Sequence, residues 1–329
     1  MSPAVDVGAL ADGVLRGDRR LLGRAITLVE SAREEDRPAA AALLARLLPH
    51  TGRAVRLGIS GAPGVGKSTF IEAFGSWLVG QGRRVAVLAV DPSSQRSGGS
   101  ILGDKTRMEQ LSRTDRAFIR PSPAGRTLGG VARRTREAML VCEAAGYDTV
   151  LIETVGVGQS EAAVASMVDM FLLLIAPGGG DDLQGIKRGI VELADLIVVT
   201  KADGTLAPDA SRIAADYAGA LGLLRPADGR WHAQVVSVSA LENRGMADVW
   251  RAVMTHHDVF VADGERDRRR ARQAAAWMWT EVTEEVTESL RSDRTVAALA
   301  RDLENDVIAG RLVPGDAARR LLNAWRGKA

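Results

Sequence analysis

The chain is poor in cysteine and in long hydrophobic runs, and both absences narrow its function. Its single cysteine, Cys142, excludes a disulfide framework and any zinc site built from several cysteines. We expect this thiol to be buried and inert. The longest apolar run, Met170 to Ala176, is far shorter than the roughly 20 residues that span a bilayer. The N-terminus also lacks the basic start and apolar core of a signal peptide, so we expect a soluble, cytoplasmic protein without membrane partners.

The chain also lacks a charge excess and has few lysines. Its 43 Lys and Arg residues oppose 41 Asp and Glu residues, which leaves a formal net charge of +2. This balance argues against non-specific binding of nucleic acid or membrane surfaces, because such proteins carry a basic excess or stripe. Only five of the basic residues are lysines, at positions 67, 105, 187, 201 and 328. Arginine therefore supplies most positive charge, and lysine is expected where a compact ammonium group or an unbranched stem is needed.

The pattern of apolar residues predicts three regions. Residues 1–50 are predicted to form a helical extension, and residues 261–329 a helical arm. Between them, in 51–260, short apolar runs alternate with helix-length amphipathic stretches, which predicts an α/β domain with a doubly wound, mainly parallel sheet. The six predicted strands are Val55–Ile59, Val85–Val90, Thr149–Ile152, Phe171–Ile175, Leu196–Val199 and Val235–Val238.

A phosphate-binding motif follows the first predicted strand. The string Gly61-Ala62-Pro63-Gly64-Val65-Gly66-Lys67-Ser68-Thr69 matches the P-loop pattern G-x-x-x-x-G-K-[ST] between a strand and a helix. Its glycines let backbone N–H groups turn toward phosphate oxygens, and the helix N-terminus adds positive charge. Lys67 is expected to reach the β- and γ-phosphates, and the Ser68 hydroxyl to bind Mg²⁺. The sequence therefore predicts a P-loop fold that binds a nucleoside triphosphate.

Two acidic residues end predicted strands near this motif. Asp91 follows the second strand, where a carboxylate points into the ligand crevice of an α/β sheet, although a helix-capping or turn Asp is the alternative. Glu153 follows the buried run Thr149–Ile152, as the acid does in a Walker B strand. Beside a P-loop, this position favours a role in binding Mg²⁺.

The choice of base follows from two later motifs. Guanine-specific GTPases carry Asn-Lys-x-Asp after a strand, and this chain has Thr200-Lys201-Ala202-Asp203. The Asp203 carboxylate can accept hydrogen bonds from guanine N1–H and its 2-amino group, which adenine cannot offer, and the Lys201 stem can pack over the base. Thr200 replaces the usual Asn, which we expect to weaken a supporting hydrogen bond. Farther on, Ser239-Ala240-Leu241 matches the loop that contacts guanine O6 through backbone N–H groups. These motifs favour GTP over ATP.

Longer strings carry a family resemblance. DPSS, GGSILGDKTRM, RPSP, ETVGVGQSE, PGGGDDLQGIKRGI and TKAD resemble the MeaB family, which includes the methylmalonic aciduria type A proteins and ArgK, also named LAO/AO transport system kinase. The resemblance implies a GTPase chaperone that gates adenosylcobalamin delivery to an acyl-CoA mutase and that protects or reactivates the mutase. Adenosylcobalamin belongs to the mutase, and an adenosyltransferase is a further implied partner. The C-terminal helices are implied to form the dimerisation arm of a homodimer.

Residue roles carried over by this resemblance extend the site. Ser68, Asp91, Asp104 and Glu153 are implied to surround Mg²⁺, directly or through water. The segment Gly178–Arg188 resembles a switch loop that communicates with the mutase; without the resemblance, it would be a plain strand-to-helix connection. Lys105 and Lys187 fall in the two implied switch segments, so we expect both to be functional.

The water-orienting group is not evident. Gln159 stands three residues after Gly156, whereas Ras-like proteins place their Gln directly after the glycine. We therefore expect slow hydrolysis that a partner accelerates by ordering Gln159, Asp104 or Lys187.

Two other functions, a protein kinase and a metal-insertion GTPase, are alternatives. The older family name implies a protein kinase that regulates amino-acid transport, and a metal-insertion GTPase is a third hypothesis. His256-His257 would fit the latter, but adjacent helical residues point about 100° apart, so we expect solvated surface histidines. We expect the arginines of Arg268–Arg272 to lie at a solvated helix start, with contact to an acidic partner as the alternative.

Overall fold

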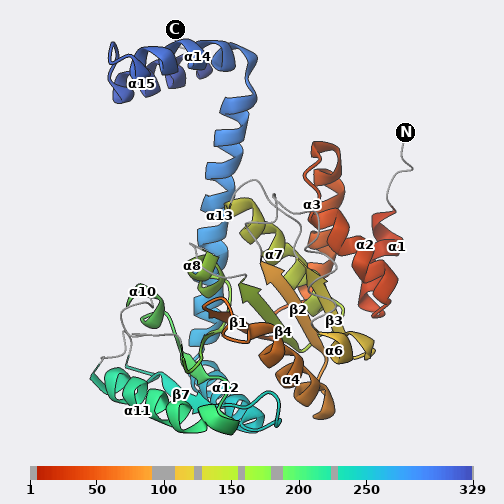
Figure 1. Cartoon of the computed structure of the whole chain (residues 1–329). Helices are drawn as coiled ribbons and strands as arrows, with labels where there is room; N and C mark the ends of the chain where they lie inside the picture. Colours follow the sequence, from red (N-terminus) through yellow and green to blue (C-terminus); the bar gives the residue numbers. More distant parts are fainter. Residues whose placement is uncertain are drawn as a thin grey trace. The chain divides into compact units, whose positions relative to one another are not determined.

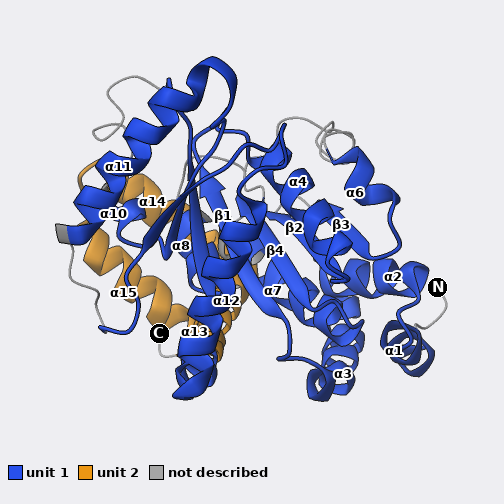
Figure 2. Ribbon diagram, turned by 90° about the horizontal axis from the view of Figure 1, so that it is seen from below, with its two compact units in different colours: residues 1–273 blue, residues 274–329 orange. Residues whose placement is uncertain are grey.

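The computed structural model describes residues 6–90, 108–121, 128–154, 160–178, 188–223 and 229–327. The chain divides into two compact units, residues 1–273 and residues 274–329, which are coloured separately in Figure 2. Helix α13 (Glu265–Ser292) runs through the boundary between the units. Within the described residues, no helix combines the length and apolarity that crossing a membrane requires.

The first unit is built on a seven-stranded sheet, drawn as arrows in Figure 1. Its strands lie in the order β3-β2-β4-β1-β5-β6-β7, and every neighbouring pair is parallel. The strands are β1 Val55–Gly61, β2 Val85–Val90, β3 Ala117–Pro121, β4 Thr149–Thr154, β5 Met170–Ile175, β6 Leu196–Val199 and β7 Gln234–Ser237. The predicted doubly wound α/β fold is therefore confirmed.

Helices cover both faces of this sheet because its buried strands are apolar on both sides. On β5, Leu172 and Leu174 pack in the core with α4 and α12, whereas Leu173 and Ile175 pack in a second core with α11. This alternation follows from the two-residue period of a strand. The helices of the α/β part are α4 Lys67–Gly80, α6 Glu109–Arg113, α7 Leu128–Ala144, α8 Ser160–Ala165, α10 Arg188–Val191, α11 Ala207–Leu223 and α12 Met246–Ala262.

The helical ends agree with the sequence pattern. Helices α1 (Val7–Leu15), α2 (Arg19–Val29) and α3 (Arg37–Leu47) pack on one another, and all three contact α7. Asp6 and Asp18 cap α1 and α2 through their carboxylates. In the second unit, α14 (Arg294–Ile308) and α15 (Pro314–Trp325) pack together as a helical pair.

Strand β3 is absent from the six strands predicted from the sequence. Its string Ala-Phe-Ile-Arg-Pro is short, and it is only partly buried because it forms an edge of the sheet. A proline at the end of an edge strand is compatible with pairing on one side only. The weak apolar signal of an edge strand explains why six runs were predicted instead of seven.

Candidate functional site

The phosphate cradle, residues Gly61–Thr69, lies at the carboxyl end of β1 and opens helix α4. Gly66 caps the helix with φ of 97°, a left-handed conformation that favours glycine. A Cβ atom at Gly61 would stand 2.5 Å from the Leu174 carbonyl oxygen of the neighbouring strand. Both glycines are therefore required by the backbone path that turns N–H groups toward a ligand.

Lys67 lies over the cradle. Its Nζ donates hydrogen bonds to the carbonyl oxygens of Gly61 at 2.8 Å and Ala62 at 3.2 Å. Burial lowers the pKa of this ammonium group, and the charges of Glu153 and Glu161 oppose that effect. A half-buried cation above a loop of inward N–H groups is suited to the phosphates of a nucleotide.

Two hard oxygen donors meet beside the cradle. The Ser68 Oγ donates a hydrogen bond to Glu153 Oε1 at 3.3 Å, and Glu153 is only 5% exposed at the end of β4. The parallel pairing of β1 and β4 places Glu153 opposite Ile59 and brings the carboxylate to the cradle edge. A hydroxyl and a carboxylate fit Mg²⁺, which takes few protein ligands when phosphates supply the rest. In the described part of the chain, no three His, Cys, Asp or Glu side chains could hold a metal by themselves.

The base motif, Thr200–Asp203, follows β6 and is tied to the cradle by side chains. The Thr200 hydroxyl donates its one proton to the Val65 carbonyl oxygen at 2.7 Å, and the Ile175 carbonyl oxygen lies 3.1 Å from the same hydroxyl. The Lys201 Nζ donates to the Gly64 carbonyl oxygen at 2.8 Å. The bonds from Thr200 and Lys201 to the cradle mean that the phosphate-binding loop and the base motif form one connected site. The expected weakening of a supporting hydrogen bond by Thr200, relative to the usual Asn, stays a prediction.

The turn that begins at Ser239 holds the Asp203 carboxylate, which is predicted to select guanine. The Ser239 Oγ donates to Asp203 Oδ2 at 2.5 Å and accepts from the Glu242 N–H at 3.1 Å. The Arg244 guanidinium donates to the Ala202 carbonyl oxygen, next to Asp203. Of the matched turn Ser239-Ala240-Leu241, Ser239 is buried, whereas the Leu241 side chain is 79% exposed. The hydrogen bond from Ser239 therefore fixes the direction of the Asp203 carboxylate.

Several predicted residues lie outside the described part of the chain: Asp91, Asp104, Lys105, Gln159, Lys187 and most of Gly178–Arg188. Cys142 is buried as expected, and burial raises the pKa of its thiol. The expectation for His256 is wrong. It is 2% exposed and stacks on Phe260 with ring centroids 4.3 Å apart, because its face of α12 points into the core.

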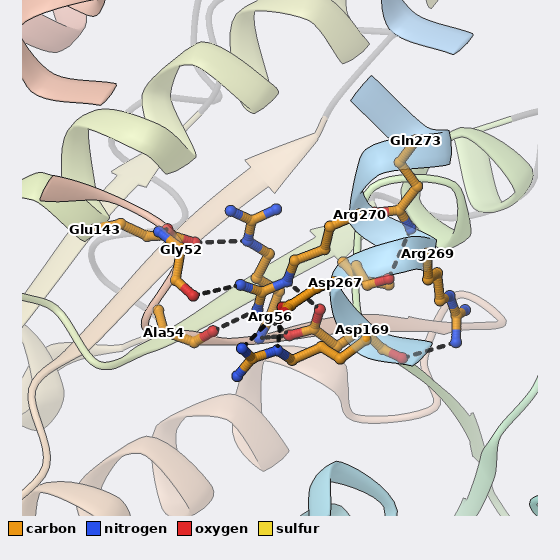
Figure 3. Close-up of polar contacts among 11 residues, drawn as sticks. Gly52, Ala54, Arg56, Glu143, Asp169, Asp267, Arg269, Arg270 and Gln273 are labelled. Atoms are coloured by element: carbon orange, nitrogen blue, oxygen red, sulfur yellow. Dashed lines mark hydrogen bonds and ion pairs between the residues drawn. The ribbon is translucent and has the colours of Figure 1, made fainter. Parts of the chain in front are cut away.

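The arginine-dense start of α13 is also not simply solvated. Arg270 donates from Nε and Nη2 to the two oxygens of Asp169, at 2.7 and 2.6 Å, and its side chain is 11% exposed. Arg56 lies beside this pair and donates from Nε to Glu143 at 2.5 Å. Figure 3 shows these four side chains, which we name the polar anchor, at the end of β1 opposite the cradle. Arg268 and Arg272, which pair with Glu265, remain more exposed.

Sequence reasoning missed the Thr200 bond to the cradle, the hydroxyl pair of Ser60 and Thr154 at 2.8 Å, and the polar anchor. Of these three features, only the Ser60–Thr154 pair had a signal in the sequence. Ser60 and Thr154 lie just after two predicted strands, and parallel strands can bring such positions together.

Comparison with known proteins decides the family. The family model described as "Methylmalonyl Co-A mutase-associated GTPase MeaB" matches residues 22–295. The chain belongs to the MeaB family of GTPases. A protein of Caulobacter vibrioides whose name describes a GTPase is 57% identical over 99% of both chains. The mouse methylmalonic aciduria type A homolog, named as mitochondrial, is 49% identical over 98% of this chain and 80% of its own length.

A solved structure agrees with this assignment. The crystal structure of an LAO/AO transport system kinase has 38% sequence identity and a TM-score of 0.76, with 97% of both chains covered. Membership of this GTPase family, together with the P-loop fold, confirms that the protein is a GTP-hydrolysing enzyme.

Proposed function

We propose that this protein is a GTP-hydrolysing chaperone that gates adenosylcobalamin loading of an acyl-CoA mutase of the methylmalonyl-CoA mutase type, and that protects or reactivates this mutase. The observation that carries the nucleotide part is the hydrogen bond from Thr200 to Val65, which joins the base motif to the cradle. The description of the family as mutase-associated supports the partner.

Guanine nucleotide binding is assigned to the cradle, the base motif and the Ser239 turn. Residues Gly61–Thr69 bind the phosphates, and Lys67 exchanges its carbonyl contacts for the β- and γ-phosphate oxygens. Asp203, oriented by Ser239, accepts from guanine N1–H and the 2-amino group. The Lys201 stem packs over the base, and the N–H groups of Ser239–Leu241 meet guanine O6.

Mg²⁺ is assigned to Ser68 and Glu153, with Asp91 and Asp104 as further ligands, directly or through water. The ion would neutralise charge on the β- and γ-phosphates, which is the main requirement of phosphoryl transfer. The Lys67 ammonium group would contribute to the same neutralisation.

Partner control is assigned to residues outside the described ranges. Gln159, Asp104 or Lys187 would orient the attacking water once the mutase orders them, so hydrolysis by the protein alone is slow. Gly178–Arg188 would be the segment that senses the mutase. Substituting Lys105 or Lys187 by Arg should impair hydrolysis or mutase coupling, and wild-type behaviour of both variants would contradict these roles.

A homodimer is proposed through the arm, residues 261–329. In the second unit, α13 carries an exposed apolar stripe in which Val282 and Val286 follow Met278 at intervals of four residues, with Trp279 beside it. Exposed apolar stripes of this kind mark association surfaces. An adenosyltransferase is a further partner, and the cytoplasm is the proposed compartment.

A pull-down with candidate mutases, in GDP and in a non-hydrolysable GTP analogue, tests this proposal. Capture of an adenosylcobalamin-dependent mutase that changes with the nucleotide is the expected result. Absence of capture in both nucleotides would contradict the proposal. Transfer of a labelled γ-phosphate to a protein hydroxyl instead of water would favour the kinase activity for which the similar solved protein is named.

A further inference from the structure

A groove of about 760 Å³ lies between helix α2 and the end of strand β3, and the function proposed above does not use it. Its walls include Arg20, Gly23, Arg24, Thr27, Glu30 and Arg120. Arg120 stands one residue before the carboxyl end of β3. In parallel α/β sheets, ligands bind at the carboxyl edge of the strands.

The charges around this groove are unbalanced. Four lining arginines, the fourth being Arg33, face only two lining carboxylates, Glu30 and Asp36. Neither Arg20 nor Arg24 forms an ion pair with another residue in the described ranges. They are one helical turn apart on α2, where like charges destabilise a helix.

Arg120 is fixed in the groove by a buried carboxylate. Its Nε donates to Glu30 Oε2 at 3.1 Å, its Nη2 donates to the Thr27 hydroxyl at 3.2 Å, and the Glu30 side chain is 6% exposed. Among the described residues, the Arg120 Nη1 has no hydrogen-bond acceptor. A guanidinium held on one edge, with N–H donors left on the other, is arranged to bind an oxyanion.

Gly23 adds an observation that is independent of charge. It lies inside α2, where glycine is unfavourable compared with alanine. No heavy atom lies within 4 Å of the place where a Cβ atom would stand, so nothing in the described protein requires a glycine here. Close approach of a ligand to the helix backbone is one reason to keep a glycine at such a position.

We propose that this groove binds a small organic phosphate. Arg20, Arg24 and Arg120 would hold its phosphate oxygens, and its apolar body would lie against Leu28 and Gly23. The volume suits a nucleotide-sized molecule. A hollow of this size between one helix and one strand end favours a small molecule over an acidic protein segment.

Calorimetric titration of the full-length protein, with its P-loop saturated by GDP and Mg²⁺, tests the proposal. The probes are inorganic tripolyphosphate, citrate and a hexaglutamate peptide. Tripolyphosphate should bind at one site, more weakly as salt rises. Arg24→Gln should lower its affinity about tenfold or more, since charged hydrogen bonds are lost. Arg16→Gln, an exposed arginine of the same helical extension outside the groove, should have no effect. Absence of binding, equal loss in both variants, or tighter binding of citrate or the peptide would overturn the proposal.

Gly23→Ala provides a test that leaves every charge in place. The variant should have a higher melting temperature, because alanine favours the helix, and a lower affinity for tripolyphosphate, because the methyl group occupies the groove. A higher melting temperature with unchanged affinity would overturn the proposal. A lower melting temperature would also overturn it, because the glycine would then serve the packing of α2.

Discussion

The Thr200 hydroxyl lies 2.7 Å from the Val65 carbonyl oxygen, although the two residues are 135 positions apart. This bond joins the loop proposed to hold the phosphates to the motif proposed to bind the base. A bound nucleotide must contact the loop and the motif at the same time. The Thr200–Val65 bond should therefore raise the affinity for the nucleotide without contacting it.

Thr200→Val removes this bond at nearly constant volume. The buried Val65 carbonyl then loses its partner, which costs about 1–2 kcal/mol, and GDP affinity should fall about tenfold. Equilibrium titration with a fluorescent GDP analogue measures this change. Thr200→Ser, which keeps the hydroxyl, is the matched control and should bind close to wild type. A valine variant with wild-type affinity would show that the bond has no role in binding.

Asp203→Asn changes the base preference. The amide can no longer accept from both guanine N–H groups, so GDP affinity should fall by at least about a hundredfold. Xanthine carries a carbonyl where guanine has its amino group, so XDP binding should improve in the same variant. Competition between GDP and XDP measures both effects. Asp209→Asn, which changes an exposed carboxylate on α11, should leave the preference intact. An unchanged preference in Asp203→Asn would remove this residue from base recognition.

Glu153→Gln tests the metal assignment. Loss of the carboxylate should raise the Mg²⁺ concentration needed for half-maximal GTP hydrolysis about 10–100-fold. GDP binding in EDTA should stay unchanged, because that binding does not use the ion. Ser68→Ala should shift the Mg²⁺ requirement in the same direction. If neither variant shifts it, the ion is held elsewhere.

The polar anchor predicts a large effect on stability. Arg270→Met leaves Asp169 buried without its main partner, and the free energy of unfolding should fall by about 3–5 kcal/mol. Arg272→Met is the control, because that side chain is 64% exposed and surface pairs contribute at most about 1 kcal/mol. Urea unfolding followed by circular dichroism compares the variants. Equal effects of both substitutions on the free energy of unfolding would contradict a special role of the polar anchor in stability.

The same pair predicts a pH dependence. Burial raises the pKa of Asp169, but hydrogen bonds from Arg270 and the charges of Arg270 and Arg56 outweigh it and hold the pKa below its usual value. The unfolded value is about 3.9, so the stabilisation is complete above it and is lost as pH falls through the lower folded pKa. The stability difference between wild type and Asp169→Asn should therefore be constant near neutral pH and shrink below about pH 4. A difference that stays constant to pH 3 would contradict this assignment.

The phosphate cradle and the base motif could be predicted from sequence because each is a short continuous string whose spacing is set by the backbone. Lys67 and Ser68 follow Gly66, the glycine that caps the helix, by one and two residues, so their positions follow from local geometry. Buried strands such as β5 were equally clear, because both of their faces are apolar.

Contacts between distant segments could not be predicted in the same way. Arg270 and Asp169 are 101 positions apart in the chain. The sequence of an arginine-dense helix start does not indicate whether one of its arginines is buried. His256 was misjudged because its burial depends on Trp231 and Phe260 packing around it, not on its neighbour in sequence. These features depend on how the chain folds back on itself, which periodicity does not specify.

We propose above all that GTP hydrolysis by this protein is coupled to an adenosylcobalamin-dependent mutase. The most direct measurement is the single-turnover rate of GTP hydrolysis with and without purified methylmalonyl-CoA mutase from the same source, with Lys67→Ala as the inactive control. The account predicts a slow rate for the protein alone and at least a tenfold increase with the mutase. Equal rates with and without the mutase, at concentrations where the two proteins bind each other, would contradict it.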